Sequence, residues 1–364
     1  MPQSPPLPPR GATTNPDSRF AAWRREAEDD GWPADEAPPP LRTHAEVDRS
    51  RTVISYNQSP DLCFDRSVNP YRGCEHGCIY CYARPSHAWL GLSPGLDFET
   101  RLFFKPDAAA QLATELAARR YSPATLLLGA NTDPYQPLER RLGITRQVLQ
   151  VLSDCRHPVA ITTKSALVLR DLDLLAPMAA QGRAAVLVSV TTLDRDLARR
   201  LEPRAAAPER RLQVIAALAG AGLPVGVLVA PLIPGLTDAD LERILERAAA
   251  AGATRAGTAL IRLPHELGGL FEDWLRTQYP QRAEKVLSLI RQCRDGRLND
   301  GRFGSRMRGG GPVADLLAQR VRLATRRLGL AGRMDTEDHG WGLDGTRFRP
   351  PRPAGTQLDL FDNP

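Results

Sequence analysis

The chain has 364 residues, of which 42% are hydrophobic and 25% charged, and its formal net charge at pH 7 is +6. This composition is typical of a globular protein with a core and excludes a fibrous or wholly disordered chain. No apolar run approaches the roughly 18 residues of a membrane span, and the first residues are proline-rich and polar, unlike a signal peptide. We therefore expect a cytoplasmic protein without a membrane partner. The mild positive charge permits a nucleic-acid partner without requiring one.

Composition divides the chain into four predicted parts. Residues 1–50 are rich in Pro, Ala and charged residues, which predicts a disordered or extended segment. Residues 51–290 alternate short apolar runs with amphipathic segments and form the predicted core. A basic, glycine-rich and helical extension follows at 291–345. Residues 346–364 are predicted to be a flexible tail.

The core contains five short, continuous apolar runs that predict strands buried on both faces. They lie at 124–130, 158–165, 184–192, 224–233 and 257–264. Amphipathic segments of helical length separate them, at 107–120, 139–154, 171–182, 208–222 and 238–252. With a further strand just before Cys74, this makes six βα units. The alternation predicts an α/β fold with a parallel sheet, either an open or closed barrel or a doubly wound sheet. In such folds the chemistry lies at the carboxyl ends of the strands.

Three of the six cysteines, Cys74, Cys78 and Cys81, lie within eight positions on the loop that follows the first predicted strand. In a reducing compartment such a cluster indicates metal binding or catalysis rather than disulfides. Thiolates bind soft metals. A zinc ion would need a fourth ligand, for which His76 and Cys63 are candidates, but no second C-x-x-C or H-x-x-x-H pair occurs. Buried cysteines without a metal are disfavoured, because surrounding glycines and prolines mark a loop.

The spacing C-x-x-x-C-x-x-C, with the aromatic residue Tyr80 before the third cysteine, resembles the signature of the radical S-adenosylmethionine (SAM) superfamily. The resemblance implies a partial (β/α)6 barrel in which Cys74, Cys78 and Cys81 hold a [4Fe-4S] cluster. It implies that SAM chelates the remaining iron and is cleaved to methionine and a 5′-deoxyadenosyl radical, which abstracts a hydrogen atom from the substrate. No second cluster motif is present, so an external donor of the flavodoxin or ferredoxin type would supply the electron.

Residues 50–315 are similar to a group of largely uncharacterised bacterial proteins related to the spore photoproduct lyases. The resemblance assigns SAM contacts to Tyr80 and to three sets of residues at the ends of the second, third and fourth strands. These are Asn131, Thr132 and Asp133 near the SAM amino group, and Lys164 and Ser189 near its carboxylate and ribose. Oxygen acceptors such as those of residues 131–133 suit an ammonium group. The alternatives are a solvated strand end for Lys164 and a core hydroxyl for Ser189.

The sequence departs from the lyases at one position. The lyases carry a cysteine just ahead of their equivalent of "TDPYQPLE", which returns a hydrogen atom to the substrate radical. Here Ala130 and Asn131 stand there without a thiol. Two other residues are therefore candidates for catalysis. The phenol of Tyr135 could relay a hydrogen atom or contact the substrate, and Cys63 could reach the pocket.

Residues 291–311 carry six arginines against two aspartates, with glycines between them. Such a loop can follow a phosphate backbone, because guanidinium groups bind phosphate oxygens well, or it can be an ordinary solvated loop. Together with the lyase resemblance, it favours a radical SAM enzyme that acts on DNA in a repair-type reaction. The alternatives are an enzyme acting on RNA, a peptide or a small molecule, and a non-enzymatic, metal-stabilised module that binds the sliding clamp.

The pentapeptide "QLDLF", Gln357 to Phe361, follows a proline-rich spacer near the end of the sequence. It resembles the motif by which bacterial proteins bind the sliding clamp. The alternative is that its apolar side chains fold back onto the enzyme.

Truncation before Gln357 should abolish binding to a purified bacterial sliding clamp, because the side chains that would enter the clamp are removed. Surface plasmon resonance measures that binding, and SAM cleavage by the same truncated protein should be unchanged. An unaltered clamp affinity would refute the assignment of the tail.

Overall fold

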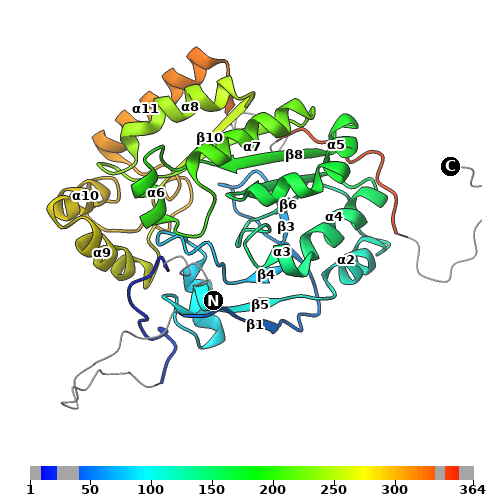
Figure 1. The fold of residues 1–364 in the computed structure, drawn as a ribbon, viewed down its shortest axis with the longest axis horizontal. Helices are drawn as coiled ribbons and strands as arrows, with labels where there is room; N and C mark the ends of the chain where they lie inside the picture. The colour runs from blue at the N-terminus through cyan, green and yellow to red at the C-terminus, as the bar shows by residue number, and fades with distance from the viewer. Residues whose placement is uncertain (1–9, 23–40, 333–340, 352–364) are drawn as a thin grey trace, which may run out of the picture.

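The computed structural model describes residues 10–22, 41–332 and 341–351, and its core is a largely parallel sheet (Figure 1). All neighbouring strands are parallel except β2 and β3, which are antiparallel. Their spatial order is β11 (Ala331–Gly332), β10 (Arg255–Leu260), β9 (Val225–Leu232), β8 (Ala184–Ser189), β7 (Val159–Thr163), β6 (Leu126–Leu128), β3 (Arg66–Val68) and β2 (Ile54–Tyr56).

The strand order distinguishes between the two predicted architectures. From β6 to β10 each strand pairs with the next one in the chain, and β3 precedes β6. In a doubly wound sheet the order of the strands reverses at a switch point, and the order of these strands does not reverse. The α/β fold of the predicted barrel type is therefore confirmed. In the described residues the order ends at β2 on one side and at β11 on the other.

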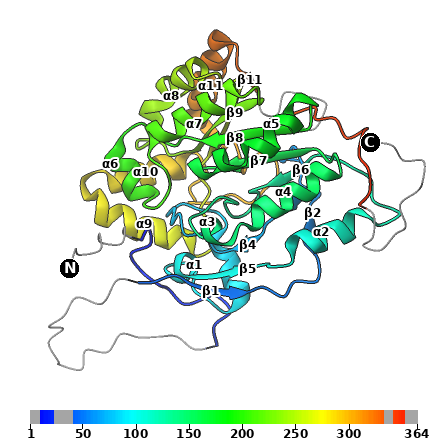
Figure 2. The ribbon, with the colours of Figure 1, turned by 45° about the vertical axis from the view of Figure 1, so that its right-hand side comes forward.

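Right-handed crossovers between sequential parallel strands place the connecting helices on one face of the sheet. α5 packs on β8, α7 on β8 and β9, α8 on β9, and α11 on β10, and Figures 1 and 2 show these helices on the same side. The longer helices are α2 (Ala108–Leu116), α4 (Ile144–Asp154), α5 (Leu172–Ala180), α7 (Pro208–Gly220), α8 (Leu241–Ala250) and α11 (Gly311–Leu328). All six residues of β8 are buried, as expected for a strand covered on both faces. α2 begins after Asp107 as predicted, although this carboxylate makes no capping hydrogen bond.

Three further helices were not predicted from the sequence: α6 (Arg195–Leu201), α9 (Leu267–Gln278) and α10 (Pro280–Gln292). α9 and α10 form a second apolar cluster with Ile79 and Tyr80 of the cysteine loop. This loop therefore has a hydrophobic support of its own beside the sheet. The remaining short elements are η1 (Arg84–Leu90), α1 (Asp97–Thr100), α3 (Glu139–Leu142), η2 (Ala166–Asp171) and η3 (Asp238–Asp240).

A small second sheet lies below the large one in Figures 1 and 2. Its order is β1 (His44–Val47), β5 (Arg101–Phe104) and β4 (Tyr71–Arg72). Tyr71 and Arg72, just before the cysteine loop, thus belong to this small sheet. The first strand of the parallel part of the large sheet is β3. The strand predicted just before Cys74 is therefore β3, which ends at Val68 and pairs in parallel with β6.

Both predicted flexible ends contain residues that pack on the core. Near the N-terminus, the main-chain N–H groups of Gly11 and Ala12 each donate to the carboxylate of Glu99 at 2.8 Å. Near the C-terminus, the Phe348 ring lies 5.6 Å from that of Tyr121. These described residues of the two end segments therefore contact the core, where they satisfy or cover buried groups. The pentapeptide 357–361 lies outside the described residues.

Glu99→Gln should lower the free energy of unfolding by roughly 3–5 kcal/mol, because it leaves the buried guanidinium of Arg84 without its counter-charge. Urea denaturation monitored by circular dichroism measures the change. The control is Glu246→Gln, which breaks an exposed pair with Arg327 and should cost about 1 kcal/mol or less. Equal effects of the two substitutions would contradict a structural role for the buried pair.

Candidate active site

A cavity of about 400 Å³ opens at the carboxyl ends of β6 to β10 and is bounded on one side by the cysteine loop. All but two of the site residues predicted from the sequence line it. They are Cys74, Cys78, Cys81, Tyr80, Asn131, Thr132, Asp133, Lys164 and Ser189. Tyr135 and Cys63 are not among its lining residues.

The cysteine loop depends on two glycines. Gly73 and Gly77 have φ angles of +75° and +68°, a region that L side chains rarely adopt. A Cβ atom on Gly73 would lie 2.6 Å from a Leu102 methyl, and one on Gly77 would lie 2.7 Å from a Glu99 oxygen. These positions therefore require glycine for both conformation and space.

The buried side chain of Arg84 holds the cysteine loop in place. Arg84 is fully buried, and its guanidinium donates to the carbonyl oxygens of Gly77 at 3.1 Å and Cys78 at 2.8 Å. It also donates to two carbonyl oxygens of segment 94–95 and pairs with Glu99. A loop outside regular secondary structure must satisfy its buried carbonyl groups in some other way, and Arg84 does so.

Gln136 holds the loop from the side of the sheet. Its side-chain oxygen accepts from Glu75 N at 2.9 Å, and its side-chain nitrogen donates to Gly73 O at 3.2 Å. Gln136 is fully buried. The segment after β6, which the resemblance linked to SAM, thus also positions the cysteines.

The three thiols suit a metal cluster better than a single ion. None of them forms a disulfide, and burial raises the pKa of Cys78 to about 12 and also raises the pKa of Cys74 and Cys81. Their ionisation therefore needs a positive group beside them, as iron atoms would be. In the described part of the chain, no three His, Cys, Asp or Glu side chains converge as ligands of one ion. Three thiols on one loop are the donor set that an iron–sulfur cluster uses, because such a cluster spreads its thiolates over several metal atoms.

Asp133 has a different role from the one expected. Its carboxylate accepts hydrogen bonds from Thr163 Oγ1 and Lys164 N at 2.7 Å and from Tyr135 N at 2.9 Å, and His76 Nδ1 lies 3.4 Å away. Burial alone would raise the pKa of Asp133, but His76 and these hydrogen bonds lower it to about 2. Four contacts use the roughly four acceptor positions of a carboxylate. Asp133 therefore supports the strand ends and has little capacity left for an ammonium group.

Ser189 and Lys164 have the properties of ligand contacts. Ser189 is 1% exposed, and its hydroxyl oxygen has no hydrogen-bond partner among the described residues although it lines the cavity. A buried hydroxyl is expected to be paired, so this one fits a bound ligand better than a core hydroxyl. Burial lowers the pKa of Lys164, but Cys78 and the Glu202 carboxylate outweigh burial and raise it, so the ammonium is charged.

Tyr80 lines the cavity with its ring, but its hydroxyl is engaged elsewhere. The hydroxyl donates to Glu202, which also pairs with the buried Arg211. Burial raises the pKa of Glu202, whereas Arg211 and Lys164 lower it, with a net value of about 2. Tyr80 can therefore contact a cofactor only through its ring, which Lys164 Nζ approaches to 5.9 Å from the centroid.

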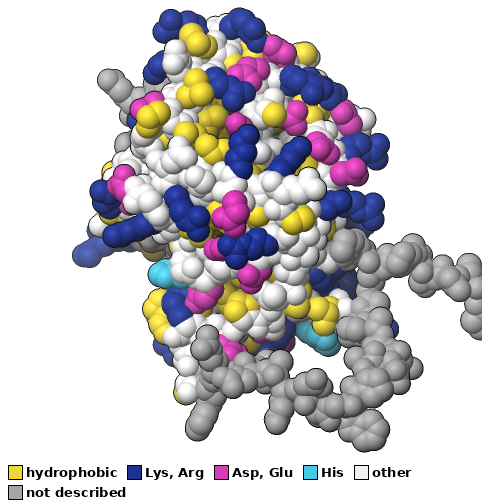
Figure 3. Space-filling model, turned by 90° about the vertical axis from the view of Figure 1, so that its left-hand side faces the viewer, with side chains coloured by type: hydrophobic (Ala, Val, Ile, Leu, Met, Phe, Trp, Pro, Cys, Tyr) yellow, Lys and Arg dark blue, Asp and Glu magenta, His cyan; other side chains and the backbone are white. Residues whose placement is uncertain are grey.

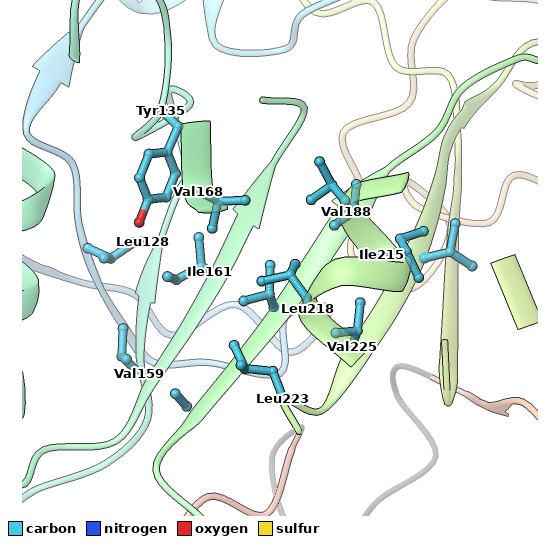
Figure 4. Close-up of a cluster of buried hydrophobic side chains, with 14 of the residues drawn as sticks. Leu128, Tyr135, Val159, Ile161, Val168, Val188, Ile215, Leu218, Leu223 and Val225 are labelled. Carbon is cyan, nitrogen blue, oxygen red and sulfur yellow. The ribbon is translucent and has the colours of Figure 1, made fainter. Parts of the chain in front are cut away.

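Tyr135 does not occupy the position expected of a substrate contact. It is fully buried, and its hydroxyl donates to Asp171 at 3.0 Å. Figure 4 shows its ring in the main hydrophobic cluster with Leu128, Ile161 and Val168. Tyr135 thus lies in the core in this structure, and its catalytic role stays a prediction that the substitution below tests. Cys63 is partly buried. Its two neighbours in the sequence, Leu62 and Phe64, line the cavity, whereas Cys63 does not.

Another tyrosine does lie in the cavity. Tyr82 directly follows the third cysteine, lines the cavity, and donates from its hydroxyl to Ala130 O. Ala130 lies in the segment where the resemblance leads one to expect a thiol and the sequence has none. In the sequence, the signal for Tyr82 is its position directly after Cys81.

The arginine-rich loop is partly structural. Arg294 is buried and donates to Leu260 O and Ile261 O, so it anchors the loop to the end of β10. Arg306 and Met307 reach the cavity wall. The loop therefore borders the site, which composition alone did not show.

Comparison with known proteins gives relatives with the same fold. A family model described as the radical SAM superfamily matches residues 68–248. An uncharacterised protein of Mycobacterium tuberculosis is 39% identical over 233 residues, 64% of this chain and 68% of the relative. An uncharacterised protein of Acidianus two-tailed virus is 30% identical over 205 residues, 54% of this chain and 66% of the relative. A solved mutant of spore photoproduct lyase, with bound AdoMet and dinucleoside spore photoproduct, has a TM-score of 0.56 and 17% identity, covering 80% and 82% of the two chains. At that identity, the likeness shows the fold alone.

Gln136→Leu should reduce the iron bound by reconstituted protein, because it leaves Glu75 N and Gly73 O buried and unpaired at about 1–3 kcal/mol each. Iron content and SAM cleavage are the measurements. The control is the neighbouring Tyr135→Phe, which should retain both and lose only about 1 kcal/mol of stability. Loss of SAM cleavage in a fully iron-loaded Tyr135→Phe protein would contradict the structural role of Tyr135.

Proposed function

The chain belongs to the radical SAM superfamily and is a radical SAM enzyme, and on this premise we propose that its cavity holds a [4Fe-4S] cluster and SAM and that its substrate is DNA, in a repair-type reaction. The observation that carries the proposal is the convergence of three thiols, a charged lysine and an unpartnered buried hydroxyl in one cavity. These groups come from separate elements, and the fold brings them together.

Cys74, Cys78 and Cys81 would hold the cluster, and their arrangement in one loop leaves room for a further ligand on it. When bound, the cluster and SAM supply the 5′-deoxyadenosyl radical that is the general reagent of this superfamily. The described residues contain no second group of cysteines, so we propose an external reductant of flavodoxin or ferredoxin type.

The remaining cavity residues would bind and orient SAM. Lys164 offers a charged ammonium group to the SAM carboxylate. Ser189 offers its unpartnered hydroxyl to a ribose or carboxylate oxygen. Asn131 and Thr132 lie at the end of β6, where the ionised Asp133 holds the backbone.

The outer half of the cavity would receive the substrate. Leu62, Phe64 and Met307 give it apolar walls, which suit the face of a nucleobase. Tyr82 stands there in place of the missing thiol, and its phenol can contact the substrate or donate a hydrogen atom. A DNA substrate is supported by the lyase fold, since a solved lyase holds a dinucleoside photoproduct.

Surface charge does not by itself support DNA binding. On the face that Figure 3 shows, Lys and Arg side chains are interspersed with Asp and Glu and form no extended patch of one sign.

No helix among the described residues is long and apolar enough to cross a membrane.

Cys78→Ala should abolish both the cluster and SAM cleavage, whereas wild-type protein reconstituted without oxygen should hold about four irons per chain. The measurements are iron and sulfide content and the 5′-deoxyadenosine formed with SAM and a strong reductant. Cys155→Ala is the matched control, because that thiol is buried in the main core away from the cavity. A full iron complement in Cys78→Ala, or zinc without 5′-deoxyadenosine in the wild type, would refute the proposal.

A further inference from the structure

Arg262 is a cation in the cavity wall that the SAM site does not use. It follows β10, and it lines the outer part of the cavity together with Arg306 and Met307. Its Nε is buried without a hydrogen-bond partner among the described residues. The guanidinium donates from NH1 to the sulfur of Met307 at a distance of 3.5 Å. A thioether sulfur is a weak acceptor.

The charges around Arg262 leave it unbalanced. The nearest carboxylate, Asp61, binds Arg306 Nε at 2.6 Å and also accepts from Gly304 N at 2.7 Å. Arg306 is held further by a hydrogen bond to Ser59. Burial lowers the pKa of Arg262, and the positive charge of Arg306 lowers it further. Two guanidinium groups thus line the cavity, and the Asp61 carboxylate pairs with only one of them, Arg306.

SAM is not expected to balance this charge. SAM carries a single anionic group, its carboxylate, and Lys164 at the end of β7 is the cation placed for it. Arg262 stands at the end of β10, three strands further along the sheet. With neighbouring strands about 4.8 Å apart, three spacings amount to roughly 14 Å along the sheet. Arg262 is therefore free to bind an anionic group other than the SAM carboxylate.

We propose that Arg262 binds a phosphate group of a nucleic-acid substrate at the outer end of the cavity, with Arg306 beside it. The proposal rests on the proposed function and specifies how the site would recognise its substrate. A guanidinium fork suits a phosphate geometrically, and its desolvated position strengthens the contact.

The neighbouring loop favours a polymer over a small phosphate ester. Arg306 Cζ lies 4.5 Å from the centroid of the Phe303 ring, which is 61% exposed. An exposed aromatic ring beside arginines is suited to stacking on an unpaired base. Arg308 follows two residues later and is exposed, so it adds a solvent-accessible positive charge to the same loop.

Binding of a fluorescein-labelled, single-stranded ten-residue oligothymidylate to the cluster-loaded enzyme tests the proposal by fluorescence anisotropy over a series of salt concentrations. Arg262→Gln should weaken binding about tenfold through the lost charged hydrogen bonds. It should also reduce the slope of log K against log salt by about 0.7, the value for one phosphate contact on a single strand. Arg262→Lys should keep the slope but bind several-fold more weakly, because the fork is lost.

The control is Arg243→Gln, which removes the same charge from an exposed position on α8 and should leave binding unchanged. Iron content and SAM cleavage without substrate are measured for all three variants and should match the wild type in Arg243→Gln. If Arg262→Gln loses iron, Arg262→Lys alone decides the result.

Three results would overturn the proposal. They are unchanged affinity in both Arg262 variants, a wild-type enzyme that cleaves SAM but does not bind the oligonucleotide, and Arg262-dependent binding of thymidine 5′-monophosphate as tight as that of the oligonucleotide. The second would leave the radical SAM assignment intact and remove only the nucleic-acid phosphate. The third would assign the site to a mononucleotide. Failure of the wild type to cleave SAM would instead refute the proposed function.

Discussion

The buried guanidinium of Arg84 is the constraint on which the rest of the site depends. The cysteine loop lies between the large sheet and the helices α9 and α10, where its carbonyl groups are shielded from water. Arg84 satisfies the carbonyl groups of Gly77 and Cys78, and Glu99 supplies the counter-charge together with the hydrogen bonds to the N-terminal segment. A single buried pair thus joins the N-terminal segment, the small sheet and the cysteine loop, and it fixes where the thiols stand.

The cavity has two halves with different chemistry. Next to the cysteine loop, Lys164 and Ser189 project from strand ends that Asp133 and Glu202 hold by buried hydrogen bonds and charge. Farther along the sheet, Arg262 lines the cavity together with Tyr82 and apolar side chains such as Leu260 and Met307. The first half is suited to a charged, polar cofactor, and the second to a ligand with an apolar face and an anionic group. Parallel strands in sequential order make this arrangement possible, because all their carboxyl ends meet at one edge.

Much of this arrangement was predictable from the sequence, and the failures have physical reasons. The strands were found because both of their faces are buried, and Cys74, Cys78 and Cys81 because their spacing is specific. Gln136, Arg84 and Glu202 were missed because a single polar residue carries no periodic signal, and only the folded chain shows that it is buried against the loop. The burial of Tyr135 was not foreseen for the same reason. Its distance in sequence from Asp133 gave no indication that the ring turns into the core.

Electron paramagnetic resonance of the reduced, reconstituted protein tests the central claim most directly, because it reports on the cluster and on what binds to it. We expect a [4Fe-4S]+ signal that changes its g values when SAM is added, since SAM would bind the iron that no cysteine holds. A cluster signal that SAM leaves unchanged, or no iron–sulfur signal at all, would contradict the account of the cavity as a joint site for the cluster and SAM.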